Sequence, residues 1–194
     1  MTRREAQAKN HPGKSAIITQ QPITDKVALE RMKGMFWDHP RNYALLVVGI
    51  NTALRASDLL TLKVADVLAD VICLREQKTG KKREFYLNGA VKRAVAPLII
   101  GRSDDDWLFP SKTTGQPICV PAFSAMVKHW AFRAGLKGMY ASHSLRKTWA
   151  RAMIDAGEPI WKVSQELDHS SEAITRRYVG LQLEDMKSMH MREV

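Results

Sequence analysis

The sequence is poor in cysteine and has no long apolar run. Its two cysteines, Cys73 and Cys119, are far apart and lack the spacing of zinc ligands, so the sequence indicates neither a disulfide framework nor a zinc site. No apolar run approaches the ~20 residues that span a bilayer, and the polar, basic N-terminus has no signal-peptide core. We therefore expect a soluble, cytoplasmic protein with no membrane partner.

Acidic residues are also scarce relative to basic ones. The chain has 30 lysines and arginines against 20 aspartates and glutamates, which gives a formal net charge of +10. A surface with this excess of positive charge attracts polyanions such as nucleic acids. The hydrophobic content of 45% over 194 residues is sufficient for one domain with its own core.

The chain divides into three predicted parts. Residues 1–20 carry basic side chains and almost no apolar anchor, which predicts a flexible basic arm that either contacts DNA or is simply disordered. Residues 21–180 hold the periodic apolar patterns of a folded domain. Residues 181–194 place apolar side chains on one helical stripe, so we expect a tail helix that packs either on its own core or on a neighbouring protomer.

Apolar periodicity predicts an α+β fold that is mostly α-helical. The first helix follows Ile23, with Thr24 or Asp25 as its cap, and is expected to stop at Pro40. Residues 43–50 are apolar on all sides, as in a buried central helix, and Ser57 offers an N-cap for a short third helix. Residues 71–87 predict a small antiparallel sheet, because two apolar stretches flank a polar turn. Later helices are expected to start near Asn88, Pro121, His143, Pro159 and Ser170 or Ser171.

Four reactive side chains lie in the last third of the chain: His143, Arg146, His169 and Tyr178. His143 and Arg146 are three residues apart near a predicted helix start, so they share one face beside free N–H groups that favour an anion. An arginine can donate two parallel hydrogen bonds to phosphate oxygens. A tyrosine has a pKa of about 10 and attacks only when a base or nearby cations favour the phenolate. Together these groups suit metal-free cleavage of a nucleic-acid backbone.

Three stretches of this sequence resemble the signature boxes of the tyrosine recombinases, also called phage integrases. They are residues 52–60 (TALRASDLL), 143–146 (HSLR) and 167–171 (LDHSS), the last followed by Tyr178. Residues 78–80 (KTG) resemble the lysine-bearing β-turn of the same family. The resemblance runs from about Ile23 to Gly180, and four elements in the right order make it specific. It implies the family's catalytic-domain fold and the activity of a site-specific recombinase, which breaks and rejoins DNA.

The resemblance also implies a role for each matching residue. Arg55 and Arg146 would clamp the non-bridging oxygens of the scissile phosphate and stabilise its transition state. Lys78 would give a proton to the leaving 5′ oxygen, although Lys81 and Lys82 are close enough in sequence to compete for this role.

The two histidines and the tyrosine complete the implied site. His143 would help to move the tyrosine proton, His169 would hydrogen-bond the phosphate, and Tyr178 would become joined to the 3′ phosphate. The phosphotyrosyl link conserves the bond energy, so no ATP is needed, and fixed cations take the place of a metal ion. The resemblance therefore implies neither a cofactor nor a metal site.

The implied partner is double-stranded DNA. Lys81, Lys82 and Arg83 at the hairpin, and Lys147 beside the second box, are candidate DNA contacts. We expect a homo-oligomer, a tetramer assembled on DNA, with DNA-bending proteins as candidate accessory partners. Because the chain begins at Met1 and continues past the tyrosine, we expect a minimal recombinase rather than an excised catalytic domain.

The sequence departs from the family pattern at four positions. Ala53 and Asp168 stand where the family usually has glycine. Asp58 stands where glutamate is frequent, and Lys147 stands where histidine is frequent. All six implied catalytic side chains are nevertheless present.

Three other functions stay open at this point. The same fold could serve a DNA-binding regulatory or architectural protein without recombinase activity. The same chemistry, with religation to the original strand, would relax DNA as type IB topoisomerases do. A metal-dependent nuclease or transposase using Asp104, Asp105 and Asp106 is disfavoured, because three consecutive carboxylates on a loop cannot all face one ion.

Overall fold

The computed structural model describes residues 20–181 and residue 191. The predicted basic arm (1–20) and tail helix (181–194) lie outside these residues, apart from Gln20, Leu181 and Met191, so both stay predictions. Helices dominate the described part, and its two strands form a small antiparallel sheet, which confirms the predicted α+β fold class. None of the described helices is long and apolar enough to span a bilayer.

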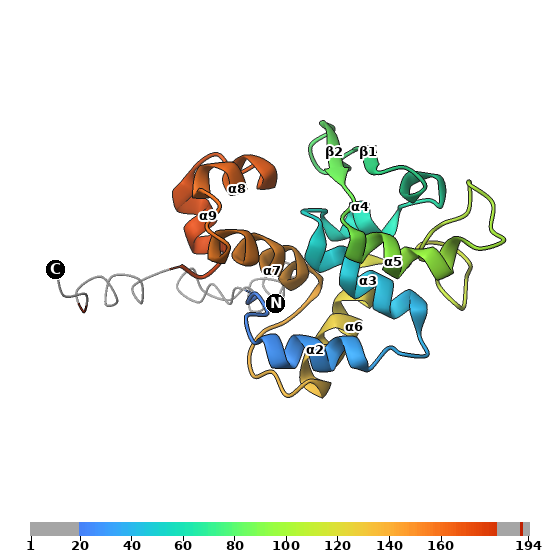
Figure 1. The fold of residues 1–194 in the computed structure, drawn as a ribbon, viewed down its shortest axis with the longest axis horizontal. Helices are drawn as coiled ribbons and strands as arrows, with labels where there is room; N and C mark the ends of the chain where they lie inside the picture. Colours follow the sequence, from blue (N-terminus) through green and yellow to red (C-terminus); the bar gives the residue numbers. More distant parts are fainter. Residues whose placement is uncertain (1–19, 182–190, 192–194) are drawn as a thin grey trace, which may run out of the picture.

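A buried helix, α3 (Pro40–Asn51), forms the centre of the fold (Figure 1). Residues 44–49 of α3 are all buried, as expected for a run that is apolar on every side. α3 packs against α5 (Gly89–Ile99) and α7 (Ser142–Asp155), while α2 (Lys26–Gly34) contacts both α3 and α6 (Val120–Arg133). Full burial of one large aliphatic side chain stabilises a fold by about 1.5–3 kcal/mol, so this core fixes where the surrounding helices sit.

Gly49 allows α3 and α7 to approach each other closely. A Cβ atom at this position would lie 2.7 Å from Leu145 Cδ1, which is closer than packed carbon atoms tolerate. Leu145 directly precedes Arg146 in α7, and the loop after α3 leads to Arg55. The core contact therefore brings two predicted site residues toward one another.

Two predicted helix boundaries are wrong. α2 ends at Gly34, and Pro40 begins α3 instead of stopping α2, because proline is well tolerated at a first helical position, where its missing N–H is not needed. α4 (Ala56–Leu60) begins before Ser57, and Arg55 rather than Ser57 is its N-cap residue. The predicted caps at Asp25, Asn88 and Ser171 are confirmed, since each side chain accepts a backbone N–H hydrogen bond.

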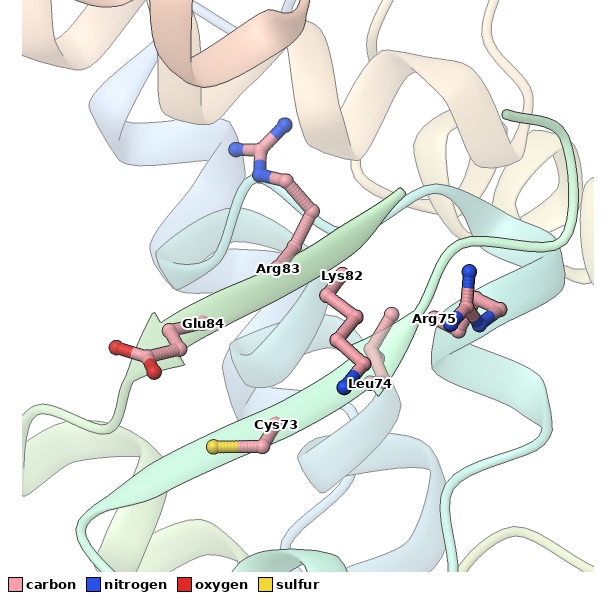
Figure 2. A pocket seen from close by; sticks show the side chains of 6 residues that line it. All are labelled: Cys73, Leu74, Arg75, Lys82, Arg83 and Glu84. Atoms are coloured by element: carbon pink, nitrogen blue, oxygen red, sulfur yellow. The ribbon is translucent and has the colours of Figure 1, made fainter. Parts of the chain in front are cut away.

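The predicted hairpin is present. A short 3₁₀ helix, η1 (Ala65–Val67), leads into β1 (Val71–Arg75), which pairs antiparallel with β2 (Lys82–Tyr86). Figure 2 shows Arg83 and Lys82 pointing to opposite sides of β2, as strand alternation requires. A hollow on the hairpin is lined by Cys73, Leu74, Arg75, Lys82, Arg83 and Glu84 (Figure 2). It contains none of the six predicted catalytic residues.

Two short helices, α8 (Ile160–Leu167) and α9 (Glu172–Tyr178), pack on each other beyond α7. The predicted site residues therefore come from four places in the fold: the turn between α3 and α4, the turn of the hairpin, the start of α7, and the segment from the end of α8 to the end of α9.

Candidate active site

Tyr178, the last residue of α9, lies between two imidazole rings. The His143 ring, from the first turn of α7, has its centroid 5.7 Å from that of Tyr178, at an interplanar angle of 83°. The His169 ring, just after α8, lies 4.9 Å away at 76°. Both are edge contacts, a favoured geometry for ring pairs. The structure thus brings together three of the predicted residues from three separate elements.

Lys147 covers the same tyrosine ring. Its ammonium nitrogen lies 4.7 Å from the centroid of the Tyr178 ring, within the range of a cation–π interaction. The residue is only 5% exposed, and burial lowers the pKa of Lys147. A contact between Lys147 and DNA stays a prediction, and the contact that the structure shows is with the tyrosine.

The phenol oxygen of Tyr178 is buried, and it has no hydrogen-bond partner of good geometry among the described residues. Burial raises the pKa of Tyr178 to about 12, although the charges of Arg146 and Arg55 and the closeness of the Arg146 guanidinium oppose the shift. The tyrosine is therefore protonated at neutral pH. Attack by its oxygen requires that this proton be passed to a base.

Arg146 links three parts of the site. Its Nη1 donates a hydrogen bond to the carbonyl oxygen of Ala53, and its Nη2 donates to the carbonyl oxygen of Leu167 at 2.9 Å. Ala53 precedes Arg55 by two residues, and Leu167 precedes His169 by two. The guanidinium has five N–H donors, so donors remain for an anion after these two bonds are made.

A pair of hydroxyl groups orients His169. Its Nδ1 lies 2.8 Å from Thr175 Oγ1, and Ser164 Oγ lies 2.8 Å both from Thr175 Oγ1 and from the carbonyl oxygen of Ile160. A carbonyl can only accept, so the single Ser164 proton goes to Ile160, and Thr175 donates its proton to Ser164. Thr175 Oγ1 is then left to accept from the His169 Nδ1–H. This arrangement leaves Nε2 as the nitrogen available to a ligand.

Positive charge gathers around His143. Burial of the ring and the charges of four cationic neighbours lower the pKa of His143 from 6.5 to about 4. The residue as a whole is exposed, so the desolvation concerns the ring beside Tyr178, and with a pKa this far below 7 the ring is neutral at neutral pH. The four neighbours are Arg146, Lys147, Lys78 and Arg55.

We expect His143 to make the protein less stable as the pH falls from 6.5 to about 4. In this window the imidazole of the unfolded chain is protonated and that of the folded chain is not, so added acid favours unfolding. Urea unfolding of the wild type and of His143→Gln, at about pH 7 and about pH 4.5, measures the effect. The wild type should lose more free energy of unfolding on acidification than the variant. Equal losses would show that the pKa of this imidazole is not lowered by folding.

The three hairpin lysines that compete for one role differ in their surroundings. Lys78 is exposed in the turn, near enough to His143 for its charge to lower the pKa of that imidazole. Lys81 is paired with Asp168, its Nζ 2.5 Å from Asp168 Oδ1. Lys82 is exposed on the outer face of β2 (Figure 2). Of the three hairpin lysines, Lys78 alone is among the charges that lower the pKa of His143, which favours it for the role beside the tyrosine.

Ion pairs tie the hairpin to the segment that carries His169. Besides the pair between Lys81 and Asp168, Arg83 Nη2 lies 2.9 Å from Glu166 Oε1 and donates to the Glu166 carbonyl oxygen at 2.7 Å. Lys81 and Arg83 were predicted to contact DNA, and the structure gives each an acidic partner. The four predicted DNA contacts, at Lys81, Lys82, Arg83 and Lys147, all stay predictions.

Asp168 is the only residue other than glycine with a positive φ among the described residues, at 56°. It is the C-cap of α8, at a position where the family usually has glycine. We expect the free energy of unfolding of Asp168→Ala to be lower than that of Asp168→Gly by about 1 kcal/mol. Both variants lose the pair with Lys81, but only alanine is strained in a left-handed backbone conformation. Chemical denaturation of the two variants measures the difference. Equal stabilities would contradict a left-handed backbone at this position.

The sequence analysis missed Glu76, the acidic partner of Arg55. The side chain of Glu76 is fully buried, and its Oε1 contacts Arg55 Nη1 and lies 3.7 Å from Arg83 Nη1. Strand alternation could have revealed it, since Ile72, Leu74 and Glu76 share the inward face of β1 and its extension. A carboxylate at an inward position needs a cationic partner, and Arg55 is the nearest in the structure.

The acidic loop at residues 104–106 does not form a metal site. Asp105 pairs with Lys63 at 2.8 Å, and Asp106 lies 3.5 Å from Arg102. Across the part of the chain that the structure describes, no three histidine, cysteine, aspartate or glutamate side chains are placed to hold one ion.

Residues 23–184 match the phage integrase family. The chain is 32% identical over 163 residues to a probable integrase/recombinase, YoeC, of Bacillus subtilis (strain 168), covering 83% of this chain and 90% of YoeC. It is 31% identical to the tyrosine recombinase XerC of Caldanaerobacter subterraneus subsp. tengcongensis, covering 79% of this chain and 44% of XerC. This chain thus spans most of YoeC but less than half of that XerC.

Solved structures share the fold. The crystal structure of XerA recombinase superposes with a TM-score of 0.72 at 22% identity, covering 95% of this chain and 68% of XerA. XerH, solved bound to its palindromic difH substrate in a post-cleavage complex, gives a TM-score of 0.69 at 19% identity, over 90% of this chain and 53% of XerH. The predicted catalytic-domain fold is confirmed, and so is the predicted class of enzyme at the level of the family, a tyrosine-type site-specific recombinase. This chain belongs to the phage integrase family.

Proposed function

We propose that this chain breaks and rejoins double-stranded DNA at specific sites, with Tyr178 as its nucleophile. The observation that carries the proposal is the convergence on one phenol: two imidazoles and an ammonium group contact its ring, and two arginines place their charge near its oxygen. These groups combine a nucleophile, proton acceptors and fixed positive charge. The family and the DNA-bound XerH neighbour support DNA as the substrate.

In the cleavage step, the phenol oxygen of Tyr178 attacks phosphorus, and the bond from phosphorus to the 5′ oxygen breaks. Arg55 and Arg146 hold the non-bridging oxygens and stabilise the negative charge that develops on them. His143 accepts the phenol proton, and Lys78 gives a proton to the leaving 5′ oxygen. The products are a 3′-phosphotyrosyl link and a free 5′ hydroxyl. Attack on that link by a 5′ hydroxyl of another strand reverses the step without ATP.

Binding of the phosphate would itself activate His143. Besides burial, nearby cations lower the pKa of His143, and three of them, Arg146, Lys78 and Arg55, would surround the phosphate. An anion placed among them offsets their charge and so raises the pKa of the imidazole by the part of the shift that these cations cause. His143 therefore becomes a better proton acceptor when the substrate is in place, which links deprotonation of Tyr178 to DNA binding.

We also propose the remaining DNA contacts and the assembly. His169 would reach a phosphate oxygen through Nε2, and the exposed Lys82 would contact the DNA backbone. Exchange between two duplexes needs four strand cleavages, and each chain supplies one nucleophile. A tetramer of this chain on DNA would supply all four.

Covalent capture on a nicked suicide substrate tests the proposal. Candidate duplexes come from the DNA that flanks the gene. In excess EDTA the wild type should form a covalent protein–DNA product on a denaturing gel, since fixed cations supply the charge that a metal would otherwise provide. Loss of the product on chelation, restored by Mg²⁺, would favour a metal-dependent nuclease. Binding without covalent product under either condition would favour a regulatory or architectural DNA-binding protein.

A further inference from the structure

Glu76 is a carboxylate inside a site that is otherwise rich in positive charge. Its side chain is fully buried against Arg55, one of the two arginines proposed to hold the phosphate. A buried carboxylate costs free energy unless it is well paired, and near a phosphate it also repels the substrate. Charge alone would thus disfavour a carboxylate at this position, and the contacts of Glu76 indicate a positioning role.

The side chain of Glu76 joins two parts of the site. One carboxylate oxygen, Oε1, forms a close ion pair with Arg55 Nη1 and lies 3.7 Å from Arg83 Nη1. The other oxygen, Oε2, accepts a hydrogen bond of 2.7 Å from the hydroxyl of Thr79, the residue after Lys78. One rigid carboxylate thus contacts both the Arg55 guanidinium and the turn that carries Lys78.

The backbone of Glu76 closes the same turn. Its N–H donates to the carbonyl oxygen of Lys81 at 3.0 Å, and its carbonyl oxygen accepts from the Gly80 N–H at 2.8 Å. Gly80 has a φ of 68°, a left-handed conformation that glycine adopts without strain. Lys78 is therefore held in a turn that begins at Glu76, and the turn cannot shift without disturbing the ion pair with Arg55.

Glu76 carries a full negative charge in this environment. Burial by itself would raise the pKa of Glu76, but the hydrogen bond from Thr79, the contact with Arg55 and the charge of Arg83 together lower it below its usual value. The carboxylate is ionised at neutral pH. The contact with Glu76 engages Nη1 of Arg55, and because a guanidinium has five N–H donors, others remain for a phosphate.

We propose that Glu76 is a positioning residue for strand cleavage, which holds Arg55 and the Lys78 turn in a fixed relation so that both act on the same phosphate. The proposal rests on the proposed function. It predicts opposite effects on two measurable steps. Loss of the charge should remove repulsion and leave DNA binding unchanged or tighter, while loss of the fixed geometry should slow cleavage.

Glu76→Gln, which keeps the size of the side chain and removes its charge, tests this prediction. We expect single-turnover cleavage of the suicide substrate to slow by about tenfold or more, with an unchanged or lower Kd for the same DNA. A purely structural role would weaken DNA binding and cleavage together, and that result would overturn the proposal. Cleavage at the wild-type rate would overturn it as well. If instead the wild type forms no covalent product, the proposed function fails first.

Glu166→Gln is the matched control. Glu166 also pairs with Arg83, at 2.9 Å, but the structure shows no ion pair between it and Arg55 within the described residues. This variant removes the same charge from the same neighbourhood. Arg83 keeps its hydrogen bond of 2.7 Å to the backbone carbonyl oxygen of residue 166, so the hairpin stays tied to α8 and the cleavage rate should stay within about twofold of the wild type. Slowing equal to that of Glu76→Gln would show a general charge effect, and it would overturn a specific role for Glu76.

A double-mutant cycle separates positioning of Arg55 from other effects. In an Arg55→Ala background, Glu76→Gln should change the cleavage rate by less than about threefold, because one of the two groups whose relation Glu76 fixes is already gone. An undiminished effect in that background would overturn the role through Arg55.

If circular dichroism shows Glu76→Gln to be unfolded, Thr79→Val tests the same link. Thr79→Val keeps the Glu76 carboxylate but removes the hydrogen bond that the turn donates to it. Cleavage should therefore slow while the Kd for DNA stays unchanged. Cleavage by this variant at the wild-type rate would overturn the proposal.

Discussion

Replacing Tyr178 by phenylalanine should abolish covalent capture of DNA and leave the fold and DNA binding intact. The ring would keep its contacts with His143, His169 and Lys147. Only the phenol oxygen is lost, and that oxygen is buried without a hydrogen-bond partner of good geometry. Burying an unpaired hydroxyl costs free energy, so urea unfolding should find the variant at least as stable as the wild type. The covalent band on the suicide substrate should fall to background, because the attacking oxygen is missing.

Tyr43→Phe is the control for this experiment. Tyr43 is a half-buried tyrosine of α3, which the structure places in the core layer rather than beside the two histidines. Its loss of a hydroxyl should leave covalent capture unchanged. A covalent band from Tyr178→Phe would assign the nucleophile to another residue, and loss of DNA binding by that variant would show that the phenol oxygen serves to bind DNA instead.

Lys78→Ala should slow cleavage by about 100-fold or more on an ordinary phosphodiester, as expected for loss of a general acid. Replacement of the leaving 5′ oxygen by sulfur should restore most of the rate, because a thiolate leaves without needing a proton. Single-turnover rates of wild type and variant on the two substrates measure the rescue. Equal slowing on both substrates would remove Lys78 from the role of proton donor.

Lys81→Ala distinguishes between neighbouring lysines in the same assay. Lys81 is held by Asp168 in the structure, so it should not supply the proton to the leaving group. Its replacement should slow cleavage of the oxygen and sulfur substrates by the same factor, whatever the size of the effect. A rescue by sulfur for Lys81→Ala, and none for Lys78→Ala, would transfer the proposed acid role to Lys81.

Much of the site could be predicted because its side chains occur in short, ordered motifs. The chemistry of His143, Arg146 and Tyr178 depends on residue type, and each carries its reactivity wherever it is placed. Helix caps at Asp25, Asn88 and Ser171 were also predictable, since a cap is a contact between residues three apart. Ser57 was misjudged as a cap: the Arg55 carbonyl oxygen already accepts the Leu59 N–H, so α4 begins at Ala56 and Arg55 is its N-cap.

Lys147, Arg83 and Lys81 show where reading the sequence fails. Nothing in the spacing of Lys147 indicates that its ammonium group covers the tyrosine, since that contact joins α7 to α9. Arg83 and Lys81 look like free basic groups at a hairpin tip, yet acidic residues more than eighty positions away neutralise them. Charge partners so distant in sequence are set by helix packing and not by local pattern.

The sequence by itself determined the fold class, the family and the kinds of reactive group, because apolar periodicity, turn residues and ordered motifs are local properties that survive without coordinates. Only the tertiary structure decided which charges face one another. The close packing of α3 on α7 at Gly49 and Leu145, and the ion pairs from the hairpin to α8, bring a phenol, two imidazoles and several cations into one volume. Burial and electrostatics there depend on distances between elements, and those distances follow from how the core packs.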